Sequence, residues 1–136
     1  MALPVDRRTA AQRSGDAAEA VVAARLAAAG WEIIGRGVRA GRAELDLVAI
    51  DPGPPAALVV VEVRWRRSRD FGLAEETVDW RKIGRLRSGL GRLLAAGMLP
   101  DGRPLPRLPA RIDLVVGEPP TRPGGPVRFR HHRSIG

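Results

Sequence analysis

The sequence contains no cysteine, which excludes both a disulfide framework and a zinc site with thiolate ligands. With only two histidines, a histidine-rich metal site is not expected either, so carboxylates are the groups that would hold any metal ion. No apolar run approaches the roughly 20 residues of a membrane span, and the first ten residues lack the apolar stretch of a secretion signal. We therefore expect a cytoplasmic protein without a membrane partner.

Lysine is almost absent: Lys82 is the one lysine among 23 basic residues, and glycine and proline are abundant. This bias is typical of a GC-rich coding sequence, so a single arginine is weak evidence of function. The distribution of charge is more informative, because residues 1–63 carry 7 basic and 8 acidic side chains, whereas residues 64–92 carry 9 and 4 and residues 103–136 carry 7 and 2. If these parts fold together, a basic surface flanks the carboxylates, as binding of a polyanion requires. The alternative is an ordinary solvated surface with skewed codon usage.

The chain length fits one domain, 1–136, of which we expect residues 1–8 and 132–136 to be flexible. Hydrophobic periodicity and the position of glycine and proline predict the elements. Helices are expected at 9–29 and 74–96, and strands at 31–38, 43–50, 58–65, 111–116 and 126–131. The order αβββαββ indicates an α/β fold with a central mixed sheet of about five strands flanked by helices.

Two acidic residues occur where apolar ones are expected. Glu19 precedes Val22 by three residues and Leu26 by seven, which places it on the stripe of the first helix that faces the core. Glu62 interrupts the valine-rich strand 58–65, on the face that also carries Arg64. A carboxylate in a buried run costs several kcal/mol unless it is paired or bound to a cation.

A second acidic pair occurs in the strand 43–50. Alternation places Glu44, Asp46 and Val48 on one face of this strand and Leu45 and Leu47 on the other. Structural ion pairs would explain these acids without any function: Asp46 could pair with an arginine such as Arg42, and Glu62 with Arg64 or Arg66. A divalent metal ion would explain them equally, since carboxylate oxygens are its preferred ligands.

The motifs together resemble the YraN family of uncharacterised bacterial proteins. The resemblance extends from about Arg13 to Asp113 and depends on the order and spacing of five segments. These are Arg13–Glu19, Gly41–Leu47, Val60–Arg66, Phe71–Gly72 with Lys82 further on, and Arg111–Val116. The YraN family is similar to archaeal Holliday-junction resolvases and to the PD-(D/E)XK restriction-endonuclease-like superfamily.

The resemblance implies a restriction-endonuclease-like sandwich that cleaves DNA with Mg²⁺ or Mn²⁺, and analogy with the resolvases implies a homodimer. Asp46 and Glu62 match the two metal-binding acids, and Glu19 matches the acid of the first helix. Glu44 matches an outer ligand or orienting group.

The sequence departs from the family pattern at three positions. Ala18 and Ala43 replace glycines, which is a small change unless the backbone has a positive φ. Arg64 replaces the superfamily's lysine; it keeps the charge and can brace a phosphate, but it cannot accept a proton. Lys82 matches a family position at the start of the second helix, where it would bind phosphate or supply the missing amine, unless it is a solvated surface lysine.

The basic residues after the third strand are candidates for nucleic-acid binding. They are Arg64, Arg66, Arg67, Arg69, Arg81, Lys82 and Arg85. Trp65 and Phe71 lie among them and could stack on unpaired bases, although Trp65 and Trp80 could as well belong to the core. No recognition motif is present, so we expect backbone recognition, of DNA more than of RNA. His131 and His132 are expected to be exposed or paired on the last strand.

Three functions remain open from the sequence. The first is a metal-dependent endonuclease with Arg64 stabilising the transition state. The second is a nucleic-acid-binding module on the same fold, with little or no cleavage because the lysine is replaced. The third is a scaffold whose acids are only ion-paired.

Overall fold

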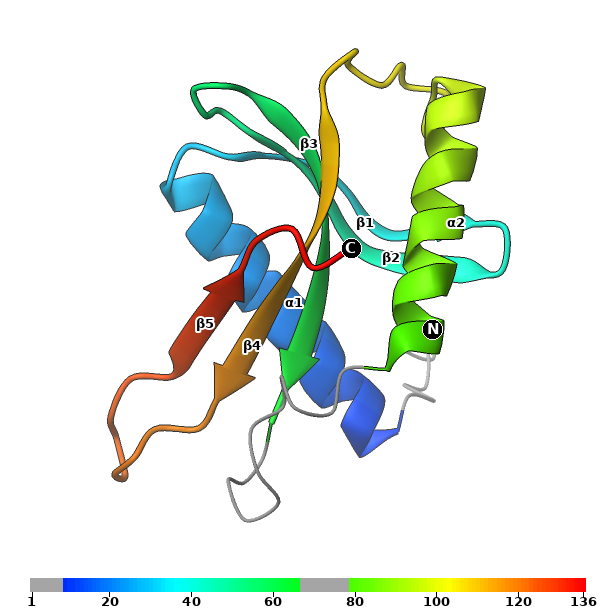
Figure 1. Cartoon of the computed structure of the whole chain (residues 1–136). Helices are drawn as coiled ribbons and strands as arrows, with labels where there is room; N and C mark the ends of the chain where they lie inside the picture. Colours follow the sequence, from blue (N-terminus) through cyan, green and yellow to red (C-terminus); the bar gives the residue numbers. More distant parts are fainter. Residues whose placement is uncertain (1–8, 67–78) are drawn as a thin grey trace, which may run out of the picture.

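The structure, a computed structural model, describes residues 9–66 and 79–136 (Figure 1). The elements are α1 (Ala10–Ala28), β1 (Glu32–Ala40), β2 (Ala43–Asp51), β3 (Ala57–Trp65), α2 (Trp80–Ala96), β4 (Ala110–Glu118) and β5 (Arg128–His132). The predicted order αβββαββ is therefore confirmed. The predicted helical residues 74–78, like the candidate binding residues Arg67 and Arg69 and Phe71, lie outside the described residues.

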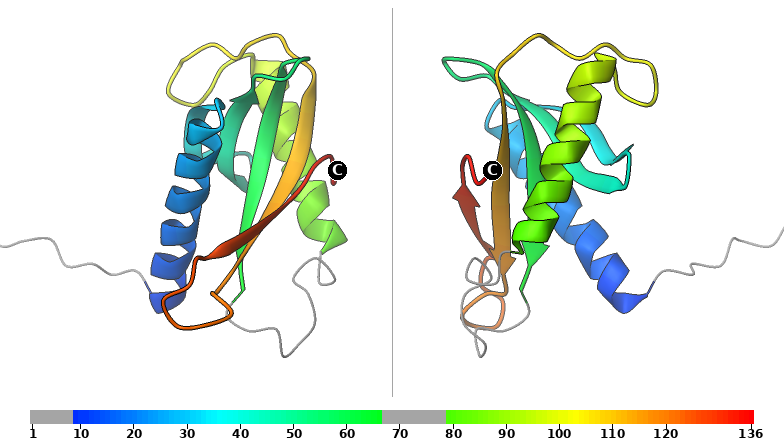
Figure 2. Two further views of the ribbon diagram at one scale, coloured as in Figure 1. Left: turned by 90° about the vertical axis from the view of Figure 1, so that its left-hand side faces the viewer. Right: turned by 45° about the vertical axis from the view of Figure 1, so that its right-hand side comes forward.

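The five strands form one mixed sheet in the order β1-β2-β3-β4-β5, and only the central pair β3–β4 is parallel. Helix α1 covers one face and α2 the other, so the sheet lies between the helices, as Figure 2 shows edge-on. The C-terminal end of β3 and the first turns of both helices lie at the same end of the molecule (bottom of Figure 1). Within residues 9–66 and 79–136, no helix is long and apolar enough to cross a membrane.

Strand β3 has apolar side chains buried on both faces, as its valine run predicts. On the α1 side, Val59 and Val61 pack with Val22 and Leu26 of the helix. On the α2 side, the cluster of buried residues includes Leu58, Val60, Leu86, Leu90 and Leu93. Each such fully buried side chain contributes about 1.5–3 kcal/mol of transfer free energy. The two helices are therefore held against opposite faces of the same strand.

Local signals fix the ends of both helices. Helix α1 ends in a Schellman motif, because Gly30 has a φ of 94° and the Trp31 N–H donates to Leu26 O at 2.9 Å. Helix α2 begins after Asp79, whose carboxylate accepts the Arg81 N–H at 2.9 Å, and ends at Gly97 in the left-handed conformation. The Asp79 cap therefore fixes the start of α2 and, with it, the positions of the side chains in the first turn.

A buried charged network lies on the α1 face of β4. Asp113 is fully buried and accepts hydrogen bonds from Arg111, from the Ser134 N–H and from His131 Nε2, the last at 2.8 Å. Arg111 also binds Asp51 at 2.7 Å. Burial by itself raises the pKa of Asp113, but these donors outweigh it and leave the pKa below its ordinary value. His131 is thus paired on the last strand, one of the two arrangements that the sequence suggests.

The C-terminal residues, expected to be flexible from the sequence, are attached to β4. His132 is the last residue of β5 and pairs with Leu114. Beyond it, the Ser134 N–H donates to Asp113 and the Ile135 N–H donates to Ile112 O at 2.8 Å. This segment therefore helps to satisfy the buried carboxylate.

Asp113→Asn should lower the free energy of unfolding at pH 7 by about 3 kcal/mol, because it removes the buried charge that pairs with both Arg111 and His131. The pKa of Asp113 is lowered by folding, so its contribution is present above the unfolded pKa and is lost as the pH falls through the folded pKa. Urea unfolding should show a constant difference between variant and wild type above about pH 5 and a shrinking one below pH 4. An equal difference at pH 3 and pH 7 would contradict this.

Candidate functional site

The candidate site lies where β2 and β3 separate. Their pairing ends at Leu47 and Val61, so the backbone of β3 beyond this point has no partner on β2. Instead, the Val63 N–H donates to Asp46 Oδ2 at 2.9 Å. The Asp46 side chain thereby takes the place of a backbone acceptor and is held beside the end of β3.

The alternation of side chains along β2 is interrupted at Asp46. Leu45 and Val48 belong to the α2-side cluster, whereas Leu47 and Ala49 belong to the α1-side cluster. The prediction that Leu45 and Leu47 share a face is therefore wrong. The strand turns locally where it leaves β3, while its register with β1 stays regular from Ala43 to Val48. As a result, Asp46 lies between the two faces and can interact with acids from both sides.

Glu62 is the buried acid of β3. Its side chain is 4% exposed, and its Oε1 lies 2.6 Å from Lys82 Nζ of α2. Its second oxygen, Oε2, is buried and has no hydrogen-bond partner. The ion pair is therefore with Lys82, not with the neighbouring Arg64 or Arg66, and Lys82 is not a solvated surface lysine.

Three other candidate residues lie around this pair. Glu19 of α1 is half-buried, and its carboxyl is within hydrogen-bonding reach of Asp46. Glu44 is exposed, with Oε1 near Gly37 of β1, and it acts on Glu19 only through its charge. Arg64 is half-buried at the end of β3, two residues beyond Glu62 and, by alternation, on the same α2 face. The structure thus brings together Glu19, Asp46, Glu62 and Lys82, and places Glu44 and Arg64 at the edges of the site.

The carboxylates of this site are costly to ionise. Burial raises the pKa of Asp46 to about 6, and the charge of Glu19 adds to this, although the Val63 N–H and Lys82 oppose it. Burial and the charge of Asp46 raise the pKa of Glu62 to about 7 despite the Lys82 ammonium. Burial also raises the pKa of Glu19. Near neutral pH the cluster therefore keeps a proton that isolated carboxyls would have lost.

Asp46 and Glu62 fit a divalent cation by their chemistry. Hard carboxylate oxygens are the ligands of Mg²⁺ and Mn²⁺, and Glu62 Oε2 is a buried oxygen that lacks a donor. In the described part of the chain, no three His, Asp or Glu side chains are already arranged as a metal-binding group. Lys82 holds the other oxygen of Glu62, so a cation would compete with this ammonium group for the carboxylate.

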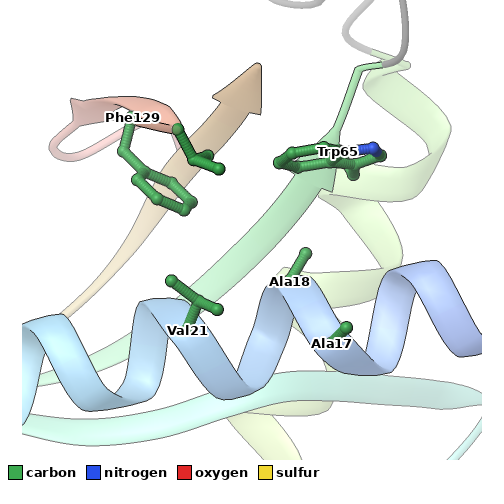
Figure 3. A pocket seen from close by; sticks show the side chains of 6 residues that line it. Ala17, Ala18, Val21, Trp65 and Phe129 are labelled. Carbon is green, nitrogen blue, oxygen red and sulfur yellow. The ribbon is translucent and has the colours of Figure 1, made fainter. Parts of the chain in front are cut away.

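An apolar cavity of about 220 Å³ adjoins the site on the α1 side. Trp65 and Phe129 line it opposite Ala17, Ala18 and Val21 of α1 (Figure 3). Trp65 also packs on Gly117, where a built Cβ would lie 2.8 Å from its ring. Trp65 is therefore a packing residue, whereas Trp80, at the start of α2, is 75% exposed and not part of the core.

The remaining candidate binding residues lie on either side of the cluster. Arg81 and Arg85 are exposed on the first turns of α2, and Arg66 is half-buried just after β3, with its N–H donating to Gly117 O. The structure places Arg42 and Arg92 beside Arg81 and Arg85 in one groove. Sequence analysis missed Arg42 as a binding candidate, because only the packing of α2 on the β1–β2 hairpin brings it beside the arginines of α2.

Comparison with known proteins identifies the family. The model of the uncharacterised protein family UPF0102 matches residues 18–116, which include all six candidate catalytic residues. The chain belongs to the UPF0102 family. This confirms the resemblance to the YraN proteins, and the matched range ends within β4, so it contains the whole carboxylate cluster.

Individual UPF0102 proteins are similar over most of their length. One from Xanthomonas euvesicatoria is 43% identical over 114 residues, 82% of this chain and 86% of the relative. One from Roseiflexus castenholzii is 41% identical over 110 residues, 81% and 80% of the two chains. One from Symbiobacterium thermophilum is 40% identical over 119 residues, 88% and 92% of the two chains.

Glu62→Gln should stabilise the metal-free protein at pH 8. Because folding raises the pKa of Glu62 from 4.5 to about 7, its favourable contribution is present below the unfolded pKa and is lost as the pH rises through 7. Glutamine does not ionise, so the variant does not lose this contribution. In EDTA, its free energy of unfolding relative to that of wild type should therefore increase by about 1–3 kcal/mol between pH 4.5 and pH 8.

The control for this measurement is Glu32→Gln, an equivalent change at an exposed position of β1. A structural ion pair predicts the opposite result, since removal of a stabilising partner of Lys82 would lower the stability at pH 8. Urea unfolding of wild type and both variants at the two pH values distinguishes these outcomes.

Proposed function

We propose that this protein is a nuclease that hydrolyses phosphodiester bonds of DNA with Mg²⁺ or Mn²⁺. The observation that supports this most is the state of Glu62, which is buried beside Asp46 with a raised pKa and with one oxygen that lacks a donor. Two adjacent carboxylates that are costly to ionise gain more from a divalent cation than from any neutral partner. A restriction-endonuclease-like fold, inferred from the family resemblance, is part of the same proposal.

Asp46 and Glu62 are the residues that would hold the cation, and Glu19 and Glu44 add negative charge around them. Bound there, a divalent ion supplies Lewis-acid polarisation of the phosphate and a water of lowered pKa. The protein's own residues provide the rest. Val63 fixes the Asp46 carboxylate through its N–H, and the Glu19 carboxyl lies within hydrogen-bonding reach of Asp46. Ligand positions fixed in advance are what precise catalysis requires.

Lys82 and Arg64 divide the role of the superfamily's lysine in this proposal. Lys82 already reaches Glu62 from α2, so an amine is present in the site although β3 carries arginine. Arg64 projects from the same face as Glu62 and can brace a phosphate through two parallel hydrogen bonds. The exposed ring of Trp80, two residues before Lys82, is available to stack on an unpaired base.

A second candidate function is supported by the Lys82–Glu62 contact itself. An ammonium group at 2.6 Å partly neutralises Glu62 in place of a cation, and Arg64 cannot accept a proton. A protein in which this contact persists on DNA would bind nucleic acid without efficient cleavage. The two functions differ in whether a divalent cation displaces Lys82.

Cleavage of labelled single-stranded, duplex, flap and four-way-junction DNA, and of RNA, tests the nuclease directly. We expect cutting with Mg²⁺ or Mn²⁺, none in EDTA, and a loss of at least about 100-fold in Asp46→Asn and Glu62→Gln. Asp101→Asn, which removes an exposed acid paired with Arg103, should cut at the wild-type rate. Tight DNA binding without cleavage of any substrate would reject the nuclease and support the second function, binding of nucleic acid without cleavage.

The role of the Lys82 amine in cleavage can be tested by removing it and placing a lysine on β3 instead. Lys82→Gln should lower the cleavage rate by about 100-fold, and the double variant Lys82→Gln with Arg64→Lys should recover part of the loss. The physical reason is that Arg64 and Glu62 share a face, so a lysine at position 64 brings its amine to the same carboxylate. Single-turnover rates with saturating protein separate this effect from binding. A normal rate in Lys82→Gln would show that Lys82 has only a structural role.

A further inference from the structure

An arginine-lined groove runs along α2 beside the carboxylate cluster. It has a volume of about 600 Å³ and lies between α2 and the β1–β2 hairpin, which Figure 1 shows next to each other. Its lining consists of Arg42, Arg81, Arg85, Ser88 and Arg92, with a floor of Ala40, Ala43 and Gly84. We refer to these residues as the arginine groove.

Small residues create the groove. Gly89 lies against the hairpin, and a Cβ at this position would be 3.0 Å from Ala43 Cβ and 3.5 Å from Ala40 Cβ. The helix can therefore approach the hairpin closely, and the small side chains of the two alanines leave the space of the groove unfilled. At the hairpin turn, Gly41 has a φ of 62°, and a Cβ there would lie 2.6 Å from Arg92 Nε. Arg92 thus lies across the turn, and both glycines are needed for this arrangement.

The arginines of the groove form one stripe of α2. Arg81, Arg85 and Arg92, together with Ser88, recur at spacings of three and four residues, so they share a helix face that is separate from the buried Leu86 and Leu90. From first to last they extend over about 16 Å of the helix, a length that covers several successive phosphates of one strand. Arg42 adds a fourth guanidinium from the hairpin.

The groove lacks the acids that normally neutralise surface arginines. Its lining contains no carboxylate, and within residues 9–66 and 79–136 none of its four arginines forms a salt bridge. By contrast, Arg103, Arg111, Arg128, Arg130 and Arg133 each have a carboxylate partner. Four guanidinium groups held together without a counter-charge repel one another, and an anionic ligand would relieve this.

The groove is continuous with the candidate site. Arg81 directly precedes Lys82, the lysine bound to Glu62. On the other wall, Ala43 precedes Asp46 by three residues of β2, which is about 10 Å along a strand. A strand of nucleic acid that crosses the carboxylates can therefore continue into the groove without leaving the protein surface.

We propose that the arginine groove binds the sugar–phosphate backbone of the nucleic-acid strand on one side of the carboxylate cluster, without reading its bases. This inference rests on the proposed function, because it assumes that nucleic acid is the ligand. Guanidinium groups contact phosphates in pairs of hydrogen bonds, and the Ser88 hydroxyl can donate one more. The groove extends the binding surface from the carboxylate cluster to the β1–β2 hairpin.

The test measures binding in EDTA, where no cleavage occurs, by fluorescence anisotropy of labelled DNA at several salt concentrations. Arg85→Gln with Arg92→Gln should weaken binding by about ten-fold or more and lower the salt slope by about 2. The matched control is Arg87→Gln with Arg107→Gln, which removes the same charge from α2 outside the groove and from an exposed loop. The control pair should change affinity less than about two-fold.

The outcomes separate the groove from the nuclease. An equal loss of DNA affinity in the groove pair and the control pair would overturn the proposal that the groove binds DNA. So would an absence of DNA binding by wild type. Polyglutamate that competes as well as DNA at equal charge would also overturn it, since the surface would then accept any polyanion. A groove-dependent loss of binding in a protein that never cleaves supports the groove and rejects the nuclease. If the protein cleaves DNA and the groove pair binds DNA as tightly as wild type, the nuclease is supported and the groove proposal is rejected.

Discussion

The hydrogen bond from the Val63 N–H to Asp46 is the interaction on which the candidate site depends. At this point β2 leaves β3, and a backbone donor inside the molecule would lose its partner, at a cost of about 1–3 kcal/mol. The Asp46 carboxylate supplies the acceptor and is fixed by doing so. The same turn of the strand carries Asp46 out of strict alternation, between Glu19 on one side of the sheet and Glu62 on the other.

The sequence predicts the fold well because each element carries its own local signal. Gly30 ends α1, the valines of β3 require burial on both faces, and the spacing of Leu86, Leu90 and Leu93 identifies the buried face of α2. It also identifies Glu19, Asp46 and Glu62, since acids in apolar patterns need a reason. What it does not predict is the partner of each acid, because Lys82 reaches Glu62 only once α2 is packed on the sheet.

The error about β2 has a related physical cause. Strict alternation assumes that β2 is a straight strand, but β2 is held between both neighbours only from Leu47 to Ile50. Before Leu47, β2 follows β1 alone, and its side chains turn with it. No local feature of the sequence Glu44-Leu45-Asp46-Leu47 marks this change. The arginine groove was missed for the same kind of reason: Arg42 and Arg92 are far apart in sequence, and Gly89 brings them together.

Two buried acids on neighbouring strands differ in how completely the protein satisfies them. Asp113 of β4 has donors on both of its oxygens, and its pKa is lowered. Glu62 of β3, on the other face, has one donor, one oxygen without a partner and an acid as its neighbour, and its pKa is raised. The chain can thus satisfy a buried carboxylate fully where stability is the requirement. It leaves Glu62 incompletely satisfied at a cost in stability, and a positively charged ligand is what would recover that cost.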